Sequence, residues 1–282
     1  VVITSDGRGD FESMTISIYD KSKKSPLQKI YSNTSSDSLG FFYGRITGLL
    51  GFKPCRHEGK ITGLAARGNS HEVIDLMRKM IDFDGKKIKA NLSKFYRPFY
   101  TNYSDELINE LKNFPKEDIA AAAQFHLEDL LIKVIRHIYD EYKLNGLPIL
   151  MAGGVFGNVK ANQRIKELNI VGEAFVQPQM SDGGLCLGAA ALLQHEEGLN
   201  ISPIENMYLG PKINENFRNE IVNHHKDLNI FKSNNLIKDF IDYLSSGKVI
   251  GLVRGRMEFG PRALCNRSII YKTSDKTVND WL

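Results

Sequence analysis

Residues 150–160 read LMAGGVFGNVK, and this stretch decides how the rest of the sequence is interpreted. A short apolar run, 148–151, leads into it and predicts a buried strand. Three glycines follow within five residues, beginning with Gly153 and Gly154, and a helix-compatible run starts near Asn158. Glycine has no Cβ and tolerates positive φ, so backbone N–H groups here can approach a ligand above the sheet edge. The stretch predicts either a site for the phosphate or ribose of a nucleotide or a tight strand-to-helix turn without a ligand.

Residues 174–197 repeat this arrangement. A predicted strand, 174–178, runs into Asp182, Gly183 and Gly184 and then into an Ala-rich helix. Two such units in succession predict neighbouring parallel strands with both glycine loops at one sheet edge, where open α/β sheets bind ligands. Asp182 is interpreted either as a plain helix cap or as a hard oxygen ligand for a divalent metal above the nucleotide.

Two shorter segments near the N-terminus each allow two interpretations. Asp6 and Gly7 lie between predicted strands 1–4 and 14–19, where a glycine-containing turn predicts a hairpin. The alternative is a phosphate-binding turn in which Asp6 holds a metal or water. Lys60 lies between glycines on an expected short connection, where it meets an anion or is simply solvated.

Residues 70–142 are expected to have a structural role and no chemistry. Residues 70–115 are charged and aromatic and are expected to be an irregular, inserted or peripheral segment. Residues 118–142 form the clearest helix, with Asp118 as its expected cap. His126 and His137 are not spaced as a metal pair on it and are expected to be solvated or core residues. The predicted core-facing residues are Phe125, Leu130, Leu131, Val134, Ile135 and Ile138.

The C-terminal part predicts a second α/β unit. Residues 198–216 are rich in Pro, Gly and Asn and are typical of an interdomain linker. A helix over 235–245 and a strand over 248–253 are expected next, followed by an arginine-rich run over 254–268 that holds one acid, Glu258. Guanidinium forks on a stiff loop bind phosphate or carboxylate, so this run favours a small-anion site over a nucleic-acid patch. The arginines are Arg254, Arg256, Arg262 and Arg267.

Composition sets outer bounds. The 282 residues predict one large or two ordinary globular domains. The net charge of +4 is mild and the lysines are scattered, which does not favour a nucleic-acid partner. No apolar run approaches the roughly 18 residues of a membrane span. The three cysteines are widely spaced, which predicts buried thiols in a reducing cytoplasm. The sequence opens inside an apparent strand at Val1, so we expect a fragment of a longer protein.

These motifs resemble the carbamoyltransferase family that modifies nodulation factors, cephamycins and aminoglycosides with a carbamoyl group. The most specific part is GRMEFGPRAL at 255–264 with Asn266, Arg267 and Ser268. The match spans nearly the whole chain and is weakest at 70–115. The other matching segments are Asp6–Gly9, Ser38–Gly40 with Tyr43 and Thr47, Glu58–Lys60, Gly153–Val155 with Asn158 and Asn162, and Ser181–Gly184 with Gly188–Ala190.

The resemblance implies an α/β fold with two domains. Residues 1–197 would be the later part of an actin-like ATPase (Kae1-like) domain, similar to the tRNA threonylcarbamoyl-transfer protein. Residues 198–216 would be a linker, and residues 217–282 the first part of a YrdC-like adenylate-forming domain.

The implied function is O-carbamoyl transfer. The second domain would join carbamoyl phosphate and ATP into carbamoyladenylate, releasing pyrophosphate, and the first would pass the carbamoyl group to a hydroxyl of a small molecule or glycan. The resemblance implies ATP with Mg, and allows a homodimer. The implied catalytic residues are Asp182, Arg256, Arg262 and Arg267. The implied nucleotide-binding residues are Asp6, Gly7, Lys60, Gly153, Gly154, Asn158, Gly183 and Gly184. The implied carbamoyl phosphate ligands are Arg254, Arg256, Arg262 and Arg267.

The resemblance also implies an iron-type metal held by a His-x3-His pair and a later Asp, which matches Asp182. That metal would polarise the carbonyl or the leaving phosphate. The His pair would lie upstream of Val1, so the fragment alone is expected to be inactive. Cys265 stands where the family usually has Gly.

Three other functions remain open on the sequence. An actin-fold sugar or acyl kinase would share the Asp-Gly and Gly-Gly loops, although it would not need an arginine-rich second domain. Threonylcarbamoyl transfer to tRNA is a related activity. A nucleotide-dependent binding module without catalysis is the non-enzyme alternative.

Overall fold

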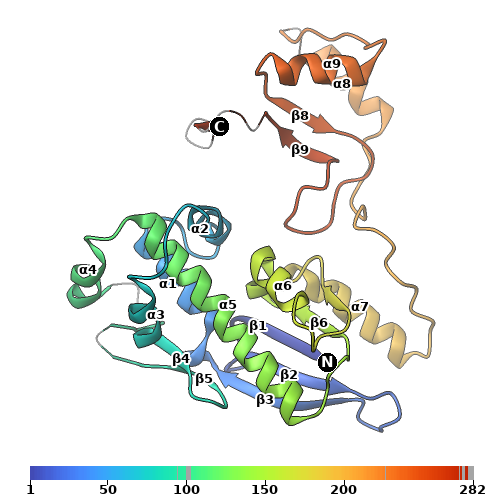
Figure 1. Cartoon of the computed structure of the whole chain (residues 1–282). Coiled ribbons are helices and arrows are strands. Elements are labelled where there is room, and N and C mark those ends of the chain that lie inside the picture. The colour runs from blue at the N-terminus through green and yellow to red at the C-terminus, as the bar shows by residue number, and fades with distance from the viewer. Residues whose placement is uncertain (94, 100–102, 226, 273, 275–276, 279–282) are drawn as a thin grey trace. The chain divides into compact units, whose positions relative to one another are not determined.

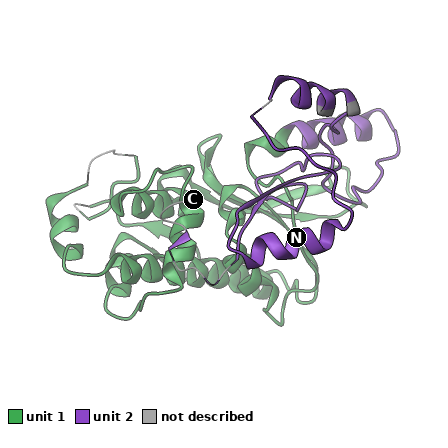
Figure 2. Cartoon of the chain, turned by 90° about the horizontal axis from the view of Figure 1, so that it is seen from above, with its two compact units in different colours: residues 1–185 green, residues 186–282 purple. Residues whose placement is uncertain are grey.

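The computed structural model describes all residues except 94, 100–102, 226, 273, 275–276 and 279–282. The chain forms two compact units, Val1–Leu185 and Cys186–Leu282 (Figures 1 and 2). Helices and strands are mixed, and the main sheet contains parallel pairs, which agrees with the predicted α/β class. The actin-like and YrdC-like assignments and the predicted domain bounds stay predictions.

A five-stranded sheet in the order β3-β2-β1-β6-β7 organises unit 1. β1 (Val2–Gly9), β2 (Glu12–Tyr19) and β3 (Leu27–Thr34) form an antiparallel meander. β6 (Ile149–Ala152) and β7 (Ala174–Val176) run parallel to β1. The predicted neighbouring parallel strands are therefore confirmed. The predicted buried strand is present as β6, but it is buried on one face only, because its residues alternate between the core and a more exposed face.

The β1–β2 hairpin turns later than expected. Asp10 and Phe11 both adopt positive φ, at 49° and 67°, as two-residue hairpin turns require. Asp6 and Gly7 therefore lie inside β1 and not in the turn. The pairing register shifts between Ser5 and Gly9, so the strand continues past Asp6 while leaving it outside the regular ladder.

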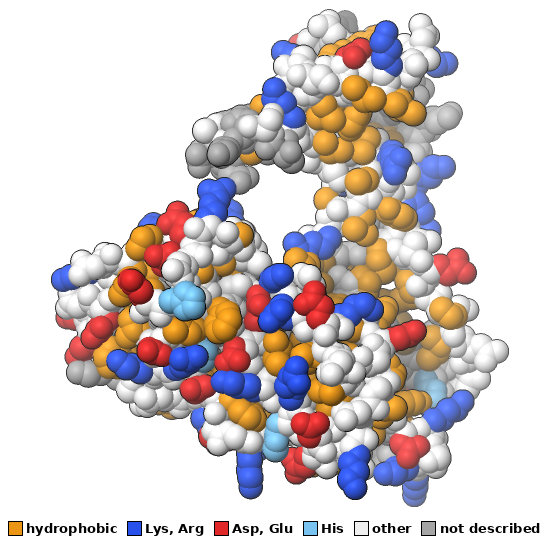
Figure 3. Space-filling model, in the orientation of Figure 1, with side chains coloured by type: hydrophobic (Ala, Val, Ile, Leu, Met, Phe, Trp, Pro, Cys, Tyr) orange, Lys and Arg blue, Asp and Glu red, His pale blue; other side chains and the backbone are white. Residues whose placement is uncertain are grey.

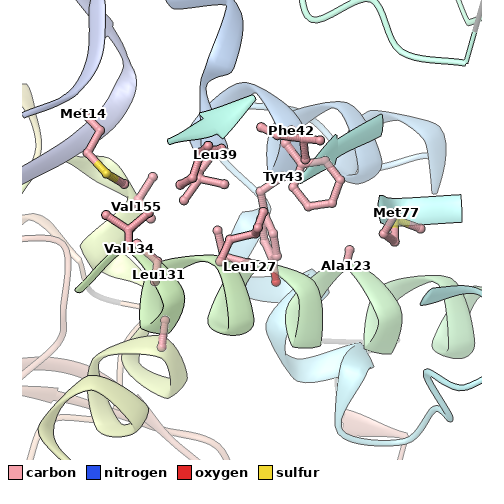
Figure 4. Close-up of a cluster of buried hydrophobic side chains, with 14 of the residues drawn as sticks. Met14, Leu39, Phe42, Tyr43, Met77, Ala123, Leu127, Leu131, Val134 and Val155 are labelled. Atoms are coloured by element: carbon pink, nitrogen blue, oxygen red, sulfur yellow. The ribbon is translucent and has the colours of Figure 1, made fainter. Parts of the chain in front are cut away.

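Helices cover one face of this sheet, with α5 (Lys116–Glu141) at the centre. α1 (Leu39–Leu49), α2 (Glu58–Ala65) and α6 (Val159–Lys166) all contact α5. Figure 4 shows side chains of α1, α5 and the sheet meeting in the core, with Tyr43 directed toward α5. The core at α5 consists of Leu127, Leu130, Leu131, Val134, Ile135 and Ile138 with the preceding alanines.

Two expectations for α5 are wrong. Pro115 occupies the N-cap position, and the Asp118 carboxylate instead accepts a hydrogen bond from the Asn69 N–H at 2.7 Å. Phe125 is 49% exposed, whereas the other predicted core-facing residues are buried. His126 is a core residue, as one of its two interpretations stated.

The expectation of an irregular, peripheral segment at 70–115 is wrong for the residues of it that the structure describes. It contains α3 (Ile74–Met80), β4 (Ile81–Phe83), β5 (Ile88–Ala90) and α4 (Asp105–Leu111). Its apolar side chains complete the core beside α5, which supplies the contacts that its short elements need. The buried residues are Val73, Leu76, Met77, Met80, Ile81, Ile88, Tyr96, Leu107 and Leu111.

Unit 2 includes most of α7 (Leu185–Glu196), then α8 (Glu215–His224) and α9 (Leu236–Ser245), and the hairpin of β8 (Ile250–Val253) and β9 (Arg267–Ile270). α9 and β8 match the predicted helix and strand. α8 and β9 were not predicted, and β9 makes the arginine-rich run a connection within a hairpin.

The prediction of buried thiols is wrong. Cys55, Cys186 and Cys265 form no disulfide, and all three are exposed. Cys55 and Cys265 occupy turns with φ of 62° and 68°, and turns of this kind lie at the surface. Cys186 lies on α7, which has no buried residue.

Among the described residues, no helix is long and apolar enough to cross a membrane. On the face in Figure 3, basic and acidic side chains are interspersed over the surface of unit 1. That distribution matches the scattered lysines of the sequence.

Candidate functional site

The side chain of Asp6 joins β1 to the first glycine loop. Asp6 Oδ2 accepts a hydrogen bond from the Gly154 N–H at 2.9 Å, and Oδ1 accepts one from the Gly7 N–H at 2.7 Å. Gly154 opens η2 (Gly154–Gly157), the turn that leads from β6 into α6. Asp6, Gly7 and Gly154, three residues predicted to bind nucleotide, therefore lie together at the carboxyl end of β6.

The N-terminus of α1 packs closely against β1 at Asp6 and Gly7. A Cβ on Gly40 would lie 2.8 Å from the Gly7 nitrogen, so only glycine permits this approach. Ser38 caps α1 by accepting from the Phe41 N–H at 3.0 Å, and its hydroxyl donates to the Asp6 carbonyl at 2.9 Å. The helix and the strand that carry the site are thus fixed to each other.

The two glycine loops touch, as predicted. The Gly153 N–H donates to the Met180 carbonyl at 2.6 Å, and the Gln177 N–H donates to the Met151 carbonyl at 2.9 Å. Gly153 has φ of 103°, and a Cβ there would overlap the Ser5 backbone. Both loops consequently lie at one edge of the parallel strands, the edge at which open α/β sheets bind ligands.

Asp182 opens η3 (Asp182–Gly184), which precedes α7. Ser181 is the N-cap residue of η3. Asp182 is exposed, and Gly183 and Gly184 follow it in the same turn. The described residues contain no group of three His, Cys, Asp or Glu side chains that could hold a metal ion. Asp182 would supply a single ligand, and the residues described here do not form a complete metal site.

Lys60 does not lie on a short connection, as was expected. It belongs to α2, which forms despite its two glycines because Ile61 is fully buried and the helix packs on α5. Lys60 Nζ lies 5.9 Å from the ring centroid of Phe52. None of the hydrogen bonds or ion pairs among the described residues joins Lys60 to Asp6 or Gly154.

Asn158, another predicted nucleotide ligand, uses its side chain inside the protein. Its Oδ1 caps α6 by accepting from the Ala161 N–H at 3.1 Å. Its Nδ2 donates to Gln124 Oε1 at 2.8 Å, and its Oδ1 also accepts from Gln124 Nε2 at 3.1 Å. Asn158 therefore fixes the start of α6 directly behind the glycine loop.

Gln124 was not among the predicted site residues. Its position on the core-facing side of α5, next to four alanines, was a signal, because a polar residue there needs buried partners. Tyr43 is one such partner, and its OH donates to Gln124 Oε1 at 2.7 Å. Burial raises the pKa of Tyr43 far above its usual value, and nearby Glu128 and Glu58 also raise it, so the hydroxyl stays a donor.

In unit 2, three of the predicted anion-binding arginines donate to backbone carbonyls. Arg256 Nη2 and Nε donate to the carbonyls of Leu209 and Gly210, at 2.7 and 3.0 Å. Arg267 Nη1 donates to the Arg254 carbonyl at 2.7 Å, and Arg254 Nε donates to the Cys265 carbonyl at 3.1 Å. These bonds hold the arginines on one folded loop. Arg262 is exposed on the same loop.

Glu258 holds the turn of this loop. Its Oε1 accepts hydrogen bonds from the N–H groups of Leu264, Asn266 and Arg267, at 2.9, 2.7 and 3.0 Å. Desolvation acts to raise the pKa of Glu258, but hydrogen bonds from its own backbone N–H and from these three N–H groups outweigh it and lower the pKa to about 2. Asn266 is buried and its Nδ2 donates to the Arg256 carbonyl at 2.7 Å. This bond joins the beginning of the loop to its end.

Comparison with known proteins gives the family. Residues 1–191 match the carbamoyltransferase N-terminus, and residues 241–282 match the carbamoyltransferase C-terminus. An uncharacterised protein of Methanocaldococcus jannaschii is 35% identical over 96% of this chain and 52% of its own length. Nodulation protein NolO of Bradyrhizobium diazoefficiens is 29% identical over 96% of this chain and 49% of its own. Nodulation protein NolNO of Sinorhizobium fredii is 29% identical over 99% of this chain and 41% of its own.

The chain thus spans about half the length of the curated relatives that it matches. The first match alone covers more than half of the chain and includes both glycine loops and Asp6. The second covers β8, β9 and the arginine-rich loop between them. The chain belongs to the carbamoyltransferase family.

Proposed function

We propose that the protein is an O-carbamoyltransferase that activates a carbamoyl group as its adenylate. Family membership supports the transfer role. The observation that carries the nucleotide site is the meeting of both glycine loops beside Asp6, where Gly154 donates to Asp6 and Gly153 donates to Met180. Nucleotides bind at this edge of α/β sheets because backbone N–H groups and helix N-termini point toward the phosphates.

We assign carbamoyl phosphate to the arginine-rich loop of unit 2. A guanidinium has five N–H donors, and the carbonyls of Leu209 and Gly210 use two of those on Arg256. The remaining N–H groups of Arg256 would bind the phosphate group of carbamoyl phosphate, together with Arg254, Arg262 and Arg267. The backbone bonds give the loop a fixed shape before substrate arrives, which lowers the cost of ordering it.

The chemistry proceeds in three steps. Water releases inorganic phosphate from carbamoyl phosphate, and the carbamate oxygen attacks the α-phosphorus of ATP, so pyrophosphate leaves. The acceptor hydroxyl oxygen then attacks the carbamoyl carbon of the adenylate, AMP leaves with the electron pair, and the hydroxyl proton passes to solvent. AMP is a better leaving group than the oxygen of a free carbamate. The acceptor would be a hydroxyl of a small molecule or glycan.

Asp182 remains a proposed metal ligand, and no step is assigned to the metal. Lys60 and Asn158 take no direct part in this proposal. Lys60 lies on α2 without a bond to the Asp6 group, and both polar ends of the Asn158 side chain are bonded inside the protein.

The test is product analysis with the full-length protein, ATP and carbamoyl phosphate. We expect pyrophosphate release, and we expect Arg256→Ala or Arg262→Ala to abolish it. If neither change slows the release, the anion-site assignment is wrong. Formation of ADP instead of pyrophosphate would replace the proposal by a kinase, and binding of ATP without turnover would favour a binding module.

A further inference from the structure

Gln124 is a buried amide with every hydrogen-bonding position filled. It is 6% exposed on the core face of α5. Its Oε1 accepts from the Tyr43 OH at 2.7 Å and from Asn158 Nδ2 at 2.8 Å. Its Nε2 donates to Glu128 Oε1 at 2.7 Å and to Asn158 Oδ1 at 3.1 Å. A fully satisfied buried amide fixes the direction of each partner, because an unmade bond there is costly.

These partners lie on both sides of the contact between Asp6 and the glycine loop. Asn158 ends that loop and begins α6. Tyr43 lies on α1, whose cap residue Ser38 donates to the Asp6 carbonyl at 2.9 Å. The amide of Gln124 therefore connects α1, which is bonded to the strand that carries Asp6, with Asn158, which follows the turn that carries Gly154.

We propose that Gln124 is the positioning residue of the nucleotide site: it holds α1 and the glycine loop at the spacing at which the Gly154 N–H donates to Asp6, beside the position that we assign to the phosphates. This inference rests on the proposed function, because it assumes that the nucleotide binds at the two glycine loops. Gln124 acts through Asn158 and α1 and is not itself a ligand.

The orientation of the amide is set by its neighbours. The Tyr43 OH is kept protonated by burial, so it requires an acceptor. Glu128 is an acceptor that is 12% exposed, and Arg164 Nε lies 3.6 Å from its Oε2. Gln124→Glu would place a second carboxylate 2.7 Å from Glu128. The two carboxylates would then either repel each other or share a proton. The loop behind Asn158 would then move.

A second substitution should repair this damage. In Gln124→Glu with Glu128→Gln, the acid and the amide exchange places and the net charge equals that of the parent. The amide at position 128 can donate to the new carboxylate, while Tyr43 and Asn158 can still donate to it. The lost ion pair with Arg164 is partly exposed and contributes little.

The chain contains a matched control on its surface. Gln163 Nε2 donates to Glu167 Oε1 at 2.7 Å, with the same four-residue spacing on a helix, but this pair is exposed on α6. Gln163→Glu also brings two carboxylates together, but neither of them is bonded to a residue of the glycine loop.

The experiment is ATP binding by calorimetry at pH 7.5, well below the unfolding temperature, with circular dichroism of each variant. We expect Gln124→Glu to weaken binding at least tenfold, the double variant to return to within threefold of the parent, and Gln163→Glu to bind like the parent. Binding by Gln124→Glu should also improve as the pH falls to 5, because the carboxylate pair takes up a proton.

Parent affinity in Gln124→Glu, or a folded double variant that stays weak, would overturn the inference. If Gln124→Glu does not fold, Tyr43→Phe removes one donor without adding charge and should weaken binding severalfold, and an unchanged affinity there overturns the inference too. A parent protein that does not bind ATP refutes the proposed nucleotide site itself, which is a different result.

Discussion

Gly154→Ala tests whether the glycine loop binds a nucleotide or only turns the chain. A Cβ at position 154 would lie 3.1 Å from Asp6 Oδ1, closer than an ordinary contact. The Asp6 carboxylate or the loop must therefore shift by a few tenths of an ångström, which weakens the 2.9 Å bond from the Gly154 N–H to Asp6 Oδ2.

The expected loss of stability is small. A hydrogen bond to a charged group contributes about 1.5–3 kcal/mol when buried, and this one is exposed, so we expect a cost near 1 kcal/mol. Replacing glycine by alanine also restricts the unfolded chain, which offsets about 0.4–1 kcal/mol. The free energy of unfolding should stay within about 1 kcal/mol of the parent. ATP affinity should fall at least tenfold, about 1.4 kcal/mol, because the methyl group displaces the Asp6 carboxylate from the glycine loop beside which we place the phosphates.

Two neighbouring glycines are the controls. A Cβ on Gly157 would meet only Met180 Sδ at 4.0 Å, so Gly157→Ala should match the parent in stability and binding. Gly153 has φ of 103° and its Cβ would overlap the Ser5 backbone, so Gly153→Ala should lose about 3 kcal/mol or more of stability. Urea unfolding and ATP calorimetry measure both quantities. Undiminished ATP affinity in folded Gly154→Ala would refute the nucleotide site, and a stable Gly153→Ala would refute the geometry of the loop.

Four further predictions concern other parts of the chain. Burial lowers the pKa of His126 in the folded protein below the value of about 6.5 that a histidine has in the unfolded chain. Below pH 6.5 the unfolded chain therefore binds more protons than the folded protein, and the free energy of unfolding should fall as the pH drops. In urea unfolding, His126→Gln should flatten this pH dependence. Cys265 has φ of 68°, so Cys265→Gly should raise the free energy of unfolding by up to about 1 kcal/mol, whereas Cys186→Gly in α7 should lower it. Glu258→Gln should speed amide hydrogen exchange at Leu264, Asn266 and Arg267, and unchanged protection would contradict the role of the carboxylate in that turn. Asp182→Asn in the full-length protein should lose metal and carbamoyl transfer with little change in thermal stability of the metal-free protein; retained metal and normal transfer would leave Asp182 a turn residue.

The features predicted correctly depend on neighbours in the sequence. The strand, glycine loop and helix around Gly153 could be predicted because glycine spacing and the Asn158 cap act over a few residues. The repetition of this unit near Asp182 predicted parallel neighbouring strands, and the register of β6 with β7 confirms it. Sequence patterns of this kind determine local geometry whatever packs around them.

The features predicted wrongly depend on distant residues. α2 forms around Lys60 because the buried Ile61 packs it on α5, which outweighs the low helix propensity of its glycines. The segment 70–115 looked irregular because its elements are short and obtain their apolar partners from α5. Asp6 was placed in a turn because the register shift in β1 is set by pairing with β2 and leaves no local signal.

Polar side chains were the hardest to interpret, because the same residue can bind a ligand or the protein itself. Asn158 was predicted to bind nucleotide, yet its amide is bonded to Gln124 and to the cap of α6. Arg256 was predicted to bind an anion, yet two N–H groups of its guanidinium donate to the carbonyls of Leu209 and Gly210. In each unit, residues proposed as ligands are held in place by other polar groups of the same unit. The residues that the sequence suggested as ligands therefore include several that hold neighbouring groups in place. Gln124, which the sequence did not suggest, connects α1 with the end of the first glycine loop.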